Sequence, residues 1–148
     1  MSTEPDPFMD EAIAQAAASL AQGGVPVGSL LVRDGKVIAA GHNQRVQRGD
    51  PIAHGEMDCL RNAGRQTRYR DMTLYTTLSP CMMCAGTIVQ FGIGKVVIGE
   101  NQTFGGNEAF LESRGVTVDL RSDPRCKALM DDFIARYPKV WLEDIGEE

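Results

Sequence analysis

The sequence has no excess of positive charge. It contains 15 lysine and arginine residues against 20 aspartate and glutamate residues, which gives a net charge of -5 and an isoelectric point near 5.0. Binding to a phosphate backbone requires clustered basic side chains, so this balance disfavours nucleic acid as a partner. Arg61, Arg65, Arg68 and Arg70 form only a modest basic cluster. The charge favours a small molecule, neutral or cationic, as the ligand.

Segments for membrane insertion or export are also missing. No apolar run approaches the ~20 residues that are needed to cross a bilayer. Residues 1–7 are acidic and contain proline, without the apolar stretch of a signal peptide. The four cysteines are therefore expected in a reducing compartment, which suits thiolate ligands for a metal better than disulfides. We expect a cytoplasmic protein that is not bound to a membrane.

Internal repeats and low-complexity segments are absent as well. The apolar fraction of 43% and the charged fraction of 24% are ordinary for a globular protein. A chain of 148 residues is large enough to bury a substantial hydrophobic core. We predict a single domain over residues 1–148, with a loose lead-in at 1–7 and a C-terminal tail at 138–148.

Apolar periodicity and turn residues predict that helices alternate with strands. The helices are expected at about 8–22, 53–63, 80–91, 107–113 and 124–136. The strands are expected at about 25–32, 36–40, 73–77, 96–98 and 116–120, with a polar loop at 44–51. This order predicts an α/β fold, a three-layer α/β/α sandwich with a central five-stranded mixed sheet and helices on both faces.

The segment from Thr77 to Cys84 carries the most distinctive chemistry. Two cysteines three positions apart lie on the same side of a helix. Ser79 is expected to cap that helix and Pro80 to occupy its first position. Both sulfurs would then lie near a helix N-terminus, where the partial positive charge favours the thiolate. His54 is expected to lie at the start of the preceding helix, at the same edge of the sheet.

These side chains predict a catalytic zinc site. His54, Cys81 and Cys84 would supply three ligands to one Zn2+ per chain and leave the fourth position to water. Glu56 lies about 200° round an ideal helix from His54, so it is not expected to bind the same ion. Beside the water, its carboxylate suits a general acid and base.

A structural or redox role is the alternative for the two cysteines taken alone. A structural zinc site needs a fourth ligand, for which Cys59, Cys126 and His42 are candidates. Cys59 and Cys126 lie on apolar helix faces and are expected in the core. The pairing with His54 and Glu56 favours the catalytic interpretation.

The two motifs together are the signature of zinc-dependent nucleobase deaminases, H-x-E followed by P-C-x-x-C. The sequence also resembles the fungal-type cytosine deaminases of the cytidine deaminase-like (CMP/dCMP deaminase) superfamily along nearly its whole length. The segments that carry this resemblance are Gly23–Pro26, Gly41–Asn43, His54–Glu56, Leu74–Cys84, Gly99–Asn101, Phe104, Arg125–Lys127 and Trp141–Gly146.

The resemblance implies a hydrolase that acts on a C–N bond of a free nucleobase. The reaction would convert cytosine to uracil and ammonia in pyrimidine salvage, with Glu56 moving protons between water, ring N3 and the departing amino group. The resemblance also implies a homodimer, and a C-terminal tail at 138–148 that covers the active site.

The resemblance further implies a set of substrate contacts. Asn43 and the backbone of Gly55 would hold the ring amide edge, and the backbone at Ser79 would face the reacting amine. Asp144 would accept a hydrogen bond from ring N1–H, which a nucleoside lacks. The planar base would lie between aromatic walls, and the full set is Asn43, Gly55, Ser79, Phe104, Trp141 and Asp144.

Some positions depart from the family pattern and leave the choice of base open. Val27 replaces a larger aliphatic residue, and Gly105-Gly106 replaces a more charged segment. Isocytosine, a 5-substituted cytosine or guanine are alternative substrates, and a tRNA adenosine deaminase is an alternative within the superfamily. A non-catalytic, zinc-stabilised binding module is the alternative outside it.

Overall fold

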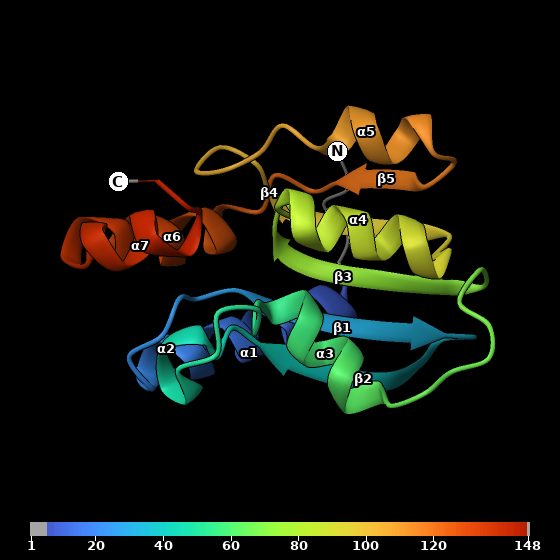
Figure 1. Cartoon of the computed structure of the whole chain (residues 1–148), viewed down its shortest axis with the longest axis horizontal. Coiled ribbons are helices and arrows are strands. Elements are labelled where there is room, and N and C mark those ends of the chain that lie inside the picture. Colours follow the sequence, from blue (N-terminus) through green and yellow to red (C-terminus); the bar gives the residue numbers. More distant parts are fainter. Residues whose placement is uncertain (1–5, 148) are drawn as a thin grey trace.

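The computed structural model of the chain describes residues 6–147. Its centre is a five-stranded sheet in the order β2-β1-β3-β4-β5 (Figure 1). Strand β1 is antiparallel to β2 and β3, whereas β3, β4 and β5 are parallel to one another, so the sheet is mixed as predicted. The strands are β1 (Gly28–Arg33), β2 (Lys36–His42), β3 (Met72–Leu78), β4 (Lys95–Glu100) and β5 (Thr117–Leu120).

Helices cover both faces of the sheet, which confirms the predicted α/β sandwich (Figure 1). They are α1 (Pro7–Ala21), α2 (Arg45–Arg48), α3 (Gly55–Ala63), α4 (Met82–Phe91), α5 (Glu108–Ser113), α6 (Pro124–Arg136) and α7 (Pro138–Asp144). Helices α2 and α7 lie beyond the same end of the strands. Within residues 6–147, no helix is long and apolar enough to cross a membrane.

The core consists of separate clusters because successive strand residues point to opposite faces of the sheet. Leu31 and Leu74 pack with α3, α4 and α5 on one face. Leu30, Val32 and Tyr75 pack with α1 and α6 on the other. Since both faces are covered, the inner strands β1, β3 and β4 are buried at nearly every position, whereas the edge strands β2 and β5 are mostly exposed or half-buried.

Three local features differ from the sequence-based expectation. The lead-in predicted at 1–7 is wrong at its end, because Asp6 accepts hydrogen bonds from the backbone of Phe8 and Met9 and so caps α1, which begins at Pro7. Residues 1–5 lie outside the described residues. The loop predicted at 44–51 contains α2, and the C-terminal tail contains α7, which begins at Pro138.

Helix α3 packs closely on β2 because residue 41 is glycine. A Cβ atom at Gly41 would lie 2.4 Å from the backbone nitrogen of Cys59 and 2.7 Å from its Cα. Backbone atoms in a helix cannot move aside as the end of a flexible side chain can. The position of α3, and of His54 at its start, therefore depends on this glycine.

The Gly41→Ala substitution is expected to lower the free energy of unfolding by about 1–3 kcal/mol, because α3 must shift away from the sheet. Gly86 in α4 is the matched control, since a Cβ atom there would meet no atom within 4 Å apart from its chain neighbours and the backbone of its own helix. Gly86→Ala is expected to raise stability by about 0.5–1 kcal/mol, because alanine favours the helix. Denaturant unfolding of both variants measures this, and a loss no larger for Gly41→Ala than for Gly86→Ala would contradict the packing argument.

Candidate active site

The candidate site lies at the edge of the sheet where β3 and β4 end. Leu78 and Glu100, the last residues of these parallel strands, are paired in register. Strand β1 begins at the same edge, where the backbone N–H of Gly28 donates to Thr77 Oγ1 at 3.0 Å. Ligand sites in α/β proteins are typically found at the carboxyl ends of parallel strands, where helices begin.

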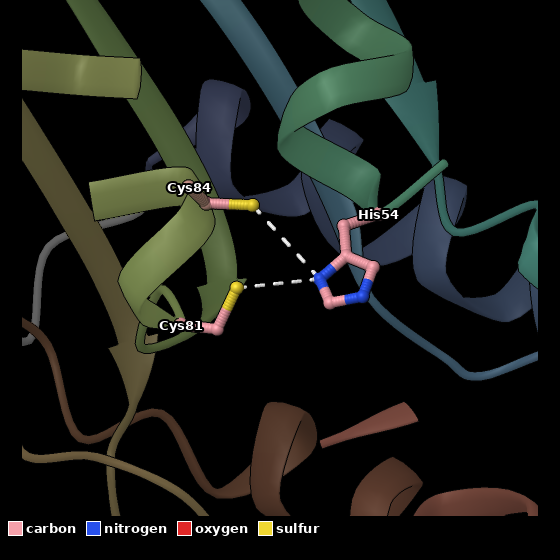
Figure 2. Close-up of side chains that lie close together, drawn as sticks. All are labelled: His54, Cys81 and Cys84. Atoms are coloured by element: carbon pink, nitrogen blue, oxygen red, sulfur yellow. Dashed lines mark hydrogen bonds between the residues drawn. The ribbon is translucent and has the colours of Figure 1, made fainter. Parts of the chain in front are cut away.

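His54, Cys81 and Cys84 meet at this edge from two helix N-termini. His54 is the N-cap residue of α3, and Cys81 is the N-cap residue of α4. The Nδ1 atom of His54 lies 3.4 Å from Cys81 Sγ and 3.9 Å from Cys84 Sγ (Figure 2). The three donor atoms all lie within 4.8 Å of one another. One nitrogen and two sulfurs at this spacing fit a tetrahedral zinc ion with one position left open.

Ser79 and Pro80 do not start helix α4 as the sequence predicts. The helix begins at Met82, because the hydroxyl and the backbone N–H of Ser79 have other partners. The hydroxyl donates to Glu108 Oε2 at 2.5 Å, and the N–H donates to the carbonyl of Glu100 at 2.9 Å. Both cysteines nevertheless remain at the helix N-terminus, as predicted.

The three donors influence one another's protonation. Hydrogen bonding from Cys84 and from His54 lowers the pKa of Cys81 to about 4. The pKa of Cys84 is raised by its hydrogen bond to Cys81 and by burial. Burial lowers the pKa of His54, but Cys81 and the nearby carboxylates outweigh it and raise the value to about 9. Because metals bind the deprotonated forms, binding releases protons from His54 and Cys84.

Glu56 lies in the first turn of α3, beside the donors but outside the group that can hold a metal. Its side chain is buried and lines the same cavity as His54. Burial raises the pKa of Glu56 to about 7. A carboxyl group in this range can both accept and donate a proton near neutral pH.

The cavity beside the donors is small, with about 300 Å3 of space between atoms, part of which is open to solvent. All six predicted substrate contacts line it. The complete lining is Val27, Asn43, His54, Gly55, Glu56, Leu78, Ser79, Cys81, Phe104, Trp141, Asp144 and Ile145. Leu78 and Ile145 are not predicted from the sequence as site residues, although both fall in segments that carry the family resemblance.

One wall of the cavity is polar. Asn43 Nδ2 donates to Asp144 Oδ1 at 3.0 Å, and Asn43 Oδ1 accepts from the backbone N–H of Arg45 at 3.0 Å. The Arg45 contact fixes the amide so that its NH2 group faces Asp144. The same Oδ1 atom of Asp144 lies 3.7 Å from His54 Nε2. Burial raises the pKa of Asp144, partly offset by His54 and by the hydrogen bond from Asn43.

Another wall is aromatic. The rings of Phe104 and Trp141 meet edge to face, with centroids 6.1 Å apart and an interplanar angle of 89°. Trp141 is 6% exposed and packs in the cluster that contains Val27 and Leu78. A small planar ligand would therefore meet apolar ring surface as well as the polar wall.

Comparisons with known proteins place these features in a family context. The sequence matches the family described as "Cytidine and deoxycytidylate deaminase zinc-binding region" over residues 2–100. It is 48% identical over 139 residues to the cytosine deaminase of Candida albicans, covering 92% of this chain and 93% of that protein. It is 38% identical over 109 residues to a tRNA-specific adenosine deaminase of Streptococcus pyogenes, covering 71% of this chain and 69% of that protein.

A solved structure shows the same fold. The guanine deaminase from Nitrosomonas europaea superposes with a TM-score of 0.73 at 24% identity, over 91% of this chain and 87% of that chain. The fold therefore occurs in a solved deaminase, as the sequence predicts.

The donor geometry predicts which substitutions abolish zinc binding. Purified protein is expected to contain one zinc ion per chain, and Cys84→Ala should reduce the zinc content to near zero because it removes one of three ligands. Cys126 is the control, because it is buried and its pKa is raised to about 12, chiefly by burial. Elemental analysis should show full zinc in Cys126→Ala. An equal loss of zinc in both variants would show that Cys126 is a ligand.

Proposed function

Because the chain belongs to the cytidine and deoxycytidylate deaminase family of zinc-binding proteins, we propose that it deaminates free cytosine to uracil and ammonia. The observation that carries this proposal is one small cavity beside the metal donors. Glu56 and the hydrogen-bonded pair Asn43–Asp144 line this cavity. The relationship to the Candida cytosine deaminase, which extends over most of both chains, supports cytosine as the base.

His54, Cys81 and Cys84 would hold the zinc ion, and their mixed nitrogen and sulfur donors fit it. When bound, zinc acts as a Lewis acid that makes water a nucleophile near neutral pH. The protein's contribution is to keep the three donors together beside a cavity that His54 and Cys81 line. Two helix N-termini provide this arrangement.

Glu56 would move the protons of the reaction. Its carboxylate takes a proton from the attacking water and delivers it to ring N3 of cytosine, while a C4–O bond forms. It then takes the proton of the new C4 hydroxyl and transfers it to the amino group, so that the C4–N bond breaks, the C4 carbonyl forms and ammonia leaves. Support comes from its burial beside the donors and from its exclusion from the metal-donor group.

Asn43 and Asp144 would select the free base. The NH2 group of Asn43 lies on the polar wall beside Asp144, where it can also donate to the carbonyl of the pyrimidine ring. Asp144 can accept a hydrogen bond from ring N1–H. A nucleoside carries ribose at N1 and lacks this hydrogen, so its ribose would crowd Asp144 without forming the hydrogen bond.

The backbone would contribute the remaining polar contacts. A Cβ atom at Gly55 would lie 2.9 Å from the carbonyl oxygen of Val27, so glycine lets α3 start close to the cavity. The backbone of Gly55 would assist Asn43, and the backbone of Ser79 would face the amine. Phe104 and Trp141 would lie against the planar ring.

We also propose the wider setting of this activity. The enzyme would act in pyrimidine salvage in the cytoplasm as a homodimer, with α7 covering the bound base. Support for α7 comes from Trp141 and Asp144, which line the cavity. Support for a homodimer comes from Met82 and Phe91, apolar residues at the two ends of α4 that are 57% and 43% exposed.

A purine deaminase is the second candidate. The similarity of this chain to the tRNA-specific adenosine deaminase of Streptococcus pyogenes supports a purine as the substrate. The net charge of -5 and the small cavity favour a free base over tRNA. Membership in the deaminase family decides against a non-catalytic binding module.

The role of Glu56 predicts the effect of Glu56→Gln, which keeps the size of the side chain but cannot shuttle protons. The rate constant kcat for cytosine is expected to fall roughly 10^2- to 10^4-fold. Zinc content should stay at one per chain, because Glu56 is not a ligand. Glu11→Gln, an exposed site in α1, is the control and should leave kcat unchanged. A Glu56→Gln enzyme with wild-type kcat would contradict the proposed role.

The role of Asp144 predicts selectivity for the free base. Ammonia release should be fast with cytosine and slight with cytidine. Asp144→Ala should lower kcat/KM for cytosine roughly 10- to 150-fold, the value of a hydrogen bond to a charged group. A screen of cytosine, isocytosine, 5-methylcytosine, guanine, cytidine and tRNA measures this directly. Equal turnover of cytosine and cytidine by the wild-type enzyme would exclude the role given to Asp144.

A further inference from the structure

Glu108, the first residue of α5, accepts hydrogen bonds from three separate segments of the chain. Its Oε2 atom accepts from Ser79 Oγ at 2.5 Å, and from the backbone N–H groups of Gly106 at 3.2 Å and Asn107 at 3.3 Å. Its Oε1 atom accepts from Asn101 Nδ2 at 2.9 Å. Burial raises the pKa of Glu108, but the hydrogen bonds from Ser79, Asn101 and Gly106 outweigh it and lower the value. The side chain is not among those that line the cavity.

Two of these partners lie on either side of Phe104 in the sequence. Asn101 precedes the loop that carries Phe104, and Gly106 follows it, so one carboxylate holds both ends of the loop. The loop ends in two glycines, and Gly106 has φ 114°, a conformation that side chains rarely adopt. The position of the Phe104 ring against Trp141 therefore depends on Glu108.

The other side of the Glu108 carboxylate holds the turn that leads to Cys81. Ser79 Oγ is bound to Glu108, and the neighbouring Asn107 donates from Nδ2 to the carbonyl of Pro80 at 2.9 Å. The Ser79 hydroxyl thus has a fixed partner, and its backbone is left to face the cavity. Glu108 and Asn107 together join this turn to the Phe104 loop.

We propose that Glu108 is a positioning residue that holds the Phe104 wall and the Ser79 turn in the arrangement that receives the base. The identity of the base rests on the proposed function, but the role of Glu108 does not. An ionised carboxylate offers only acceptors, which matches its four donors. Glutamine would direct an NH2 group at one of these donors, so Glu108→Gln should loosen the same contacts to a lesser degree.

A simpler role for Glu108 is to stabilise α5, because an acidic residue favours the first turn of a helix. The partners at Ser79 and Asn101 lie outside the helix and are not explained by that role. The experiment must therefore report on the aromatic wall as well as on stability.

Trp141 provides a signal that does not depend on activity, because it is the single tryptophan of the chain. In Glu108→Ala, the loosened loop should expose Trp141 and so increase the constant for acrylamide quenching of its fluorescence. This increase should be at least half as large as the increase caused by Phe104→Ala. Glu112→Gln is the matched control, since Glu112 lies on the same helix and is exposed. Its quenching constant should equal that of the wild type.

The kinetic test is a double-mutant cycle in the zinc-loaded enzyme with cytosine. Glu108→Ala should raise KM roughly 10-fold and change kcat less than about 3-fold, because it loosens contacts made equally to substrate and transition state. In a Phe104→Ala background, the same substitution should raise KM less than about 3-fold, since the wall that it positions is gone. Glu112→Gln should change neither constant.

Three results would overturn the proposal. The first is a wild-type quenching constant in Glu108→Ala, and the second is an equal rise of KM in the wild-type and Phe104→Ala backgrounds. The third is a Glu108→Ala protein that loses zinc but shows no change in quenching. If Glu108→Ala does not fold, Glu108→Gln and Asn101→Ala replace it, and wild-type quenching in both would overturn the proposal. Failure of the wild-type enzyme to deaminate cytosine would contradict the proposed function. The quenching comparison would still decide the role of Glu108.

Discussion

The convergence of two helix N-termini at one edge of the sheet is the constraint on which the rest of the structure depends. His54 and Cys81 each occupy the residue before a helix, in extended backbone, and this geometry brings the imidazole nitrogen within 3.4 Å of the sulfur. Strand β1 is antiparallel to both β2 and β3, so these two strands end at the same edge, and the helix starts that follow them lie there as well. The close approach of α3 to Gly41 then fixes the depth at which His54 lies.

The cavity is assembled around this centre from segments that are distant in the sequence. Asn43 and Asp144 are 101 residues apart, yet their side chains form one hydrogen bond at the polar wall. In water such groups would have to reorient around each new ligand, whereas here they are already held in place by the fold. Trp141 anchors α7 in the cluster with Phe133 and Val27, so the polar wall and the aromatic wall depend on the same packing.

The sequence predicted best those features that depend on local pattern. The strands and the sites of the metal donors follow from periodicity and motif spacing. The predicted start of α4 is wrong because the Ser79 hydroxyl donates a hydrogen bond to Glu108. The two residues are 29 positions apart, so no local pattern reveals this contact. Helix α2 is too short to show a period, and α7, which begins at Pro138, lies in the segment predicted only as a C-terminal tail.

Zinc K-edge X-ray absorption of the purified, active protein tests the central claim most directly. The account predicts two sulfur donors at ~2.3 Å and two lighter donors at ~2.0 Å, because His54, Cys81 and Cys84 bind the ion and one position stays open to solvent. The lighter donor at the open position should change when a tightly binding base analogue is added. Three or four sulfur donors, unaffected by the analogue, would make Cys59 or Cys126 a ligand and would contradict the account.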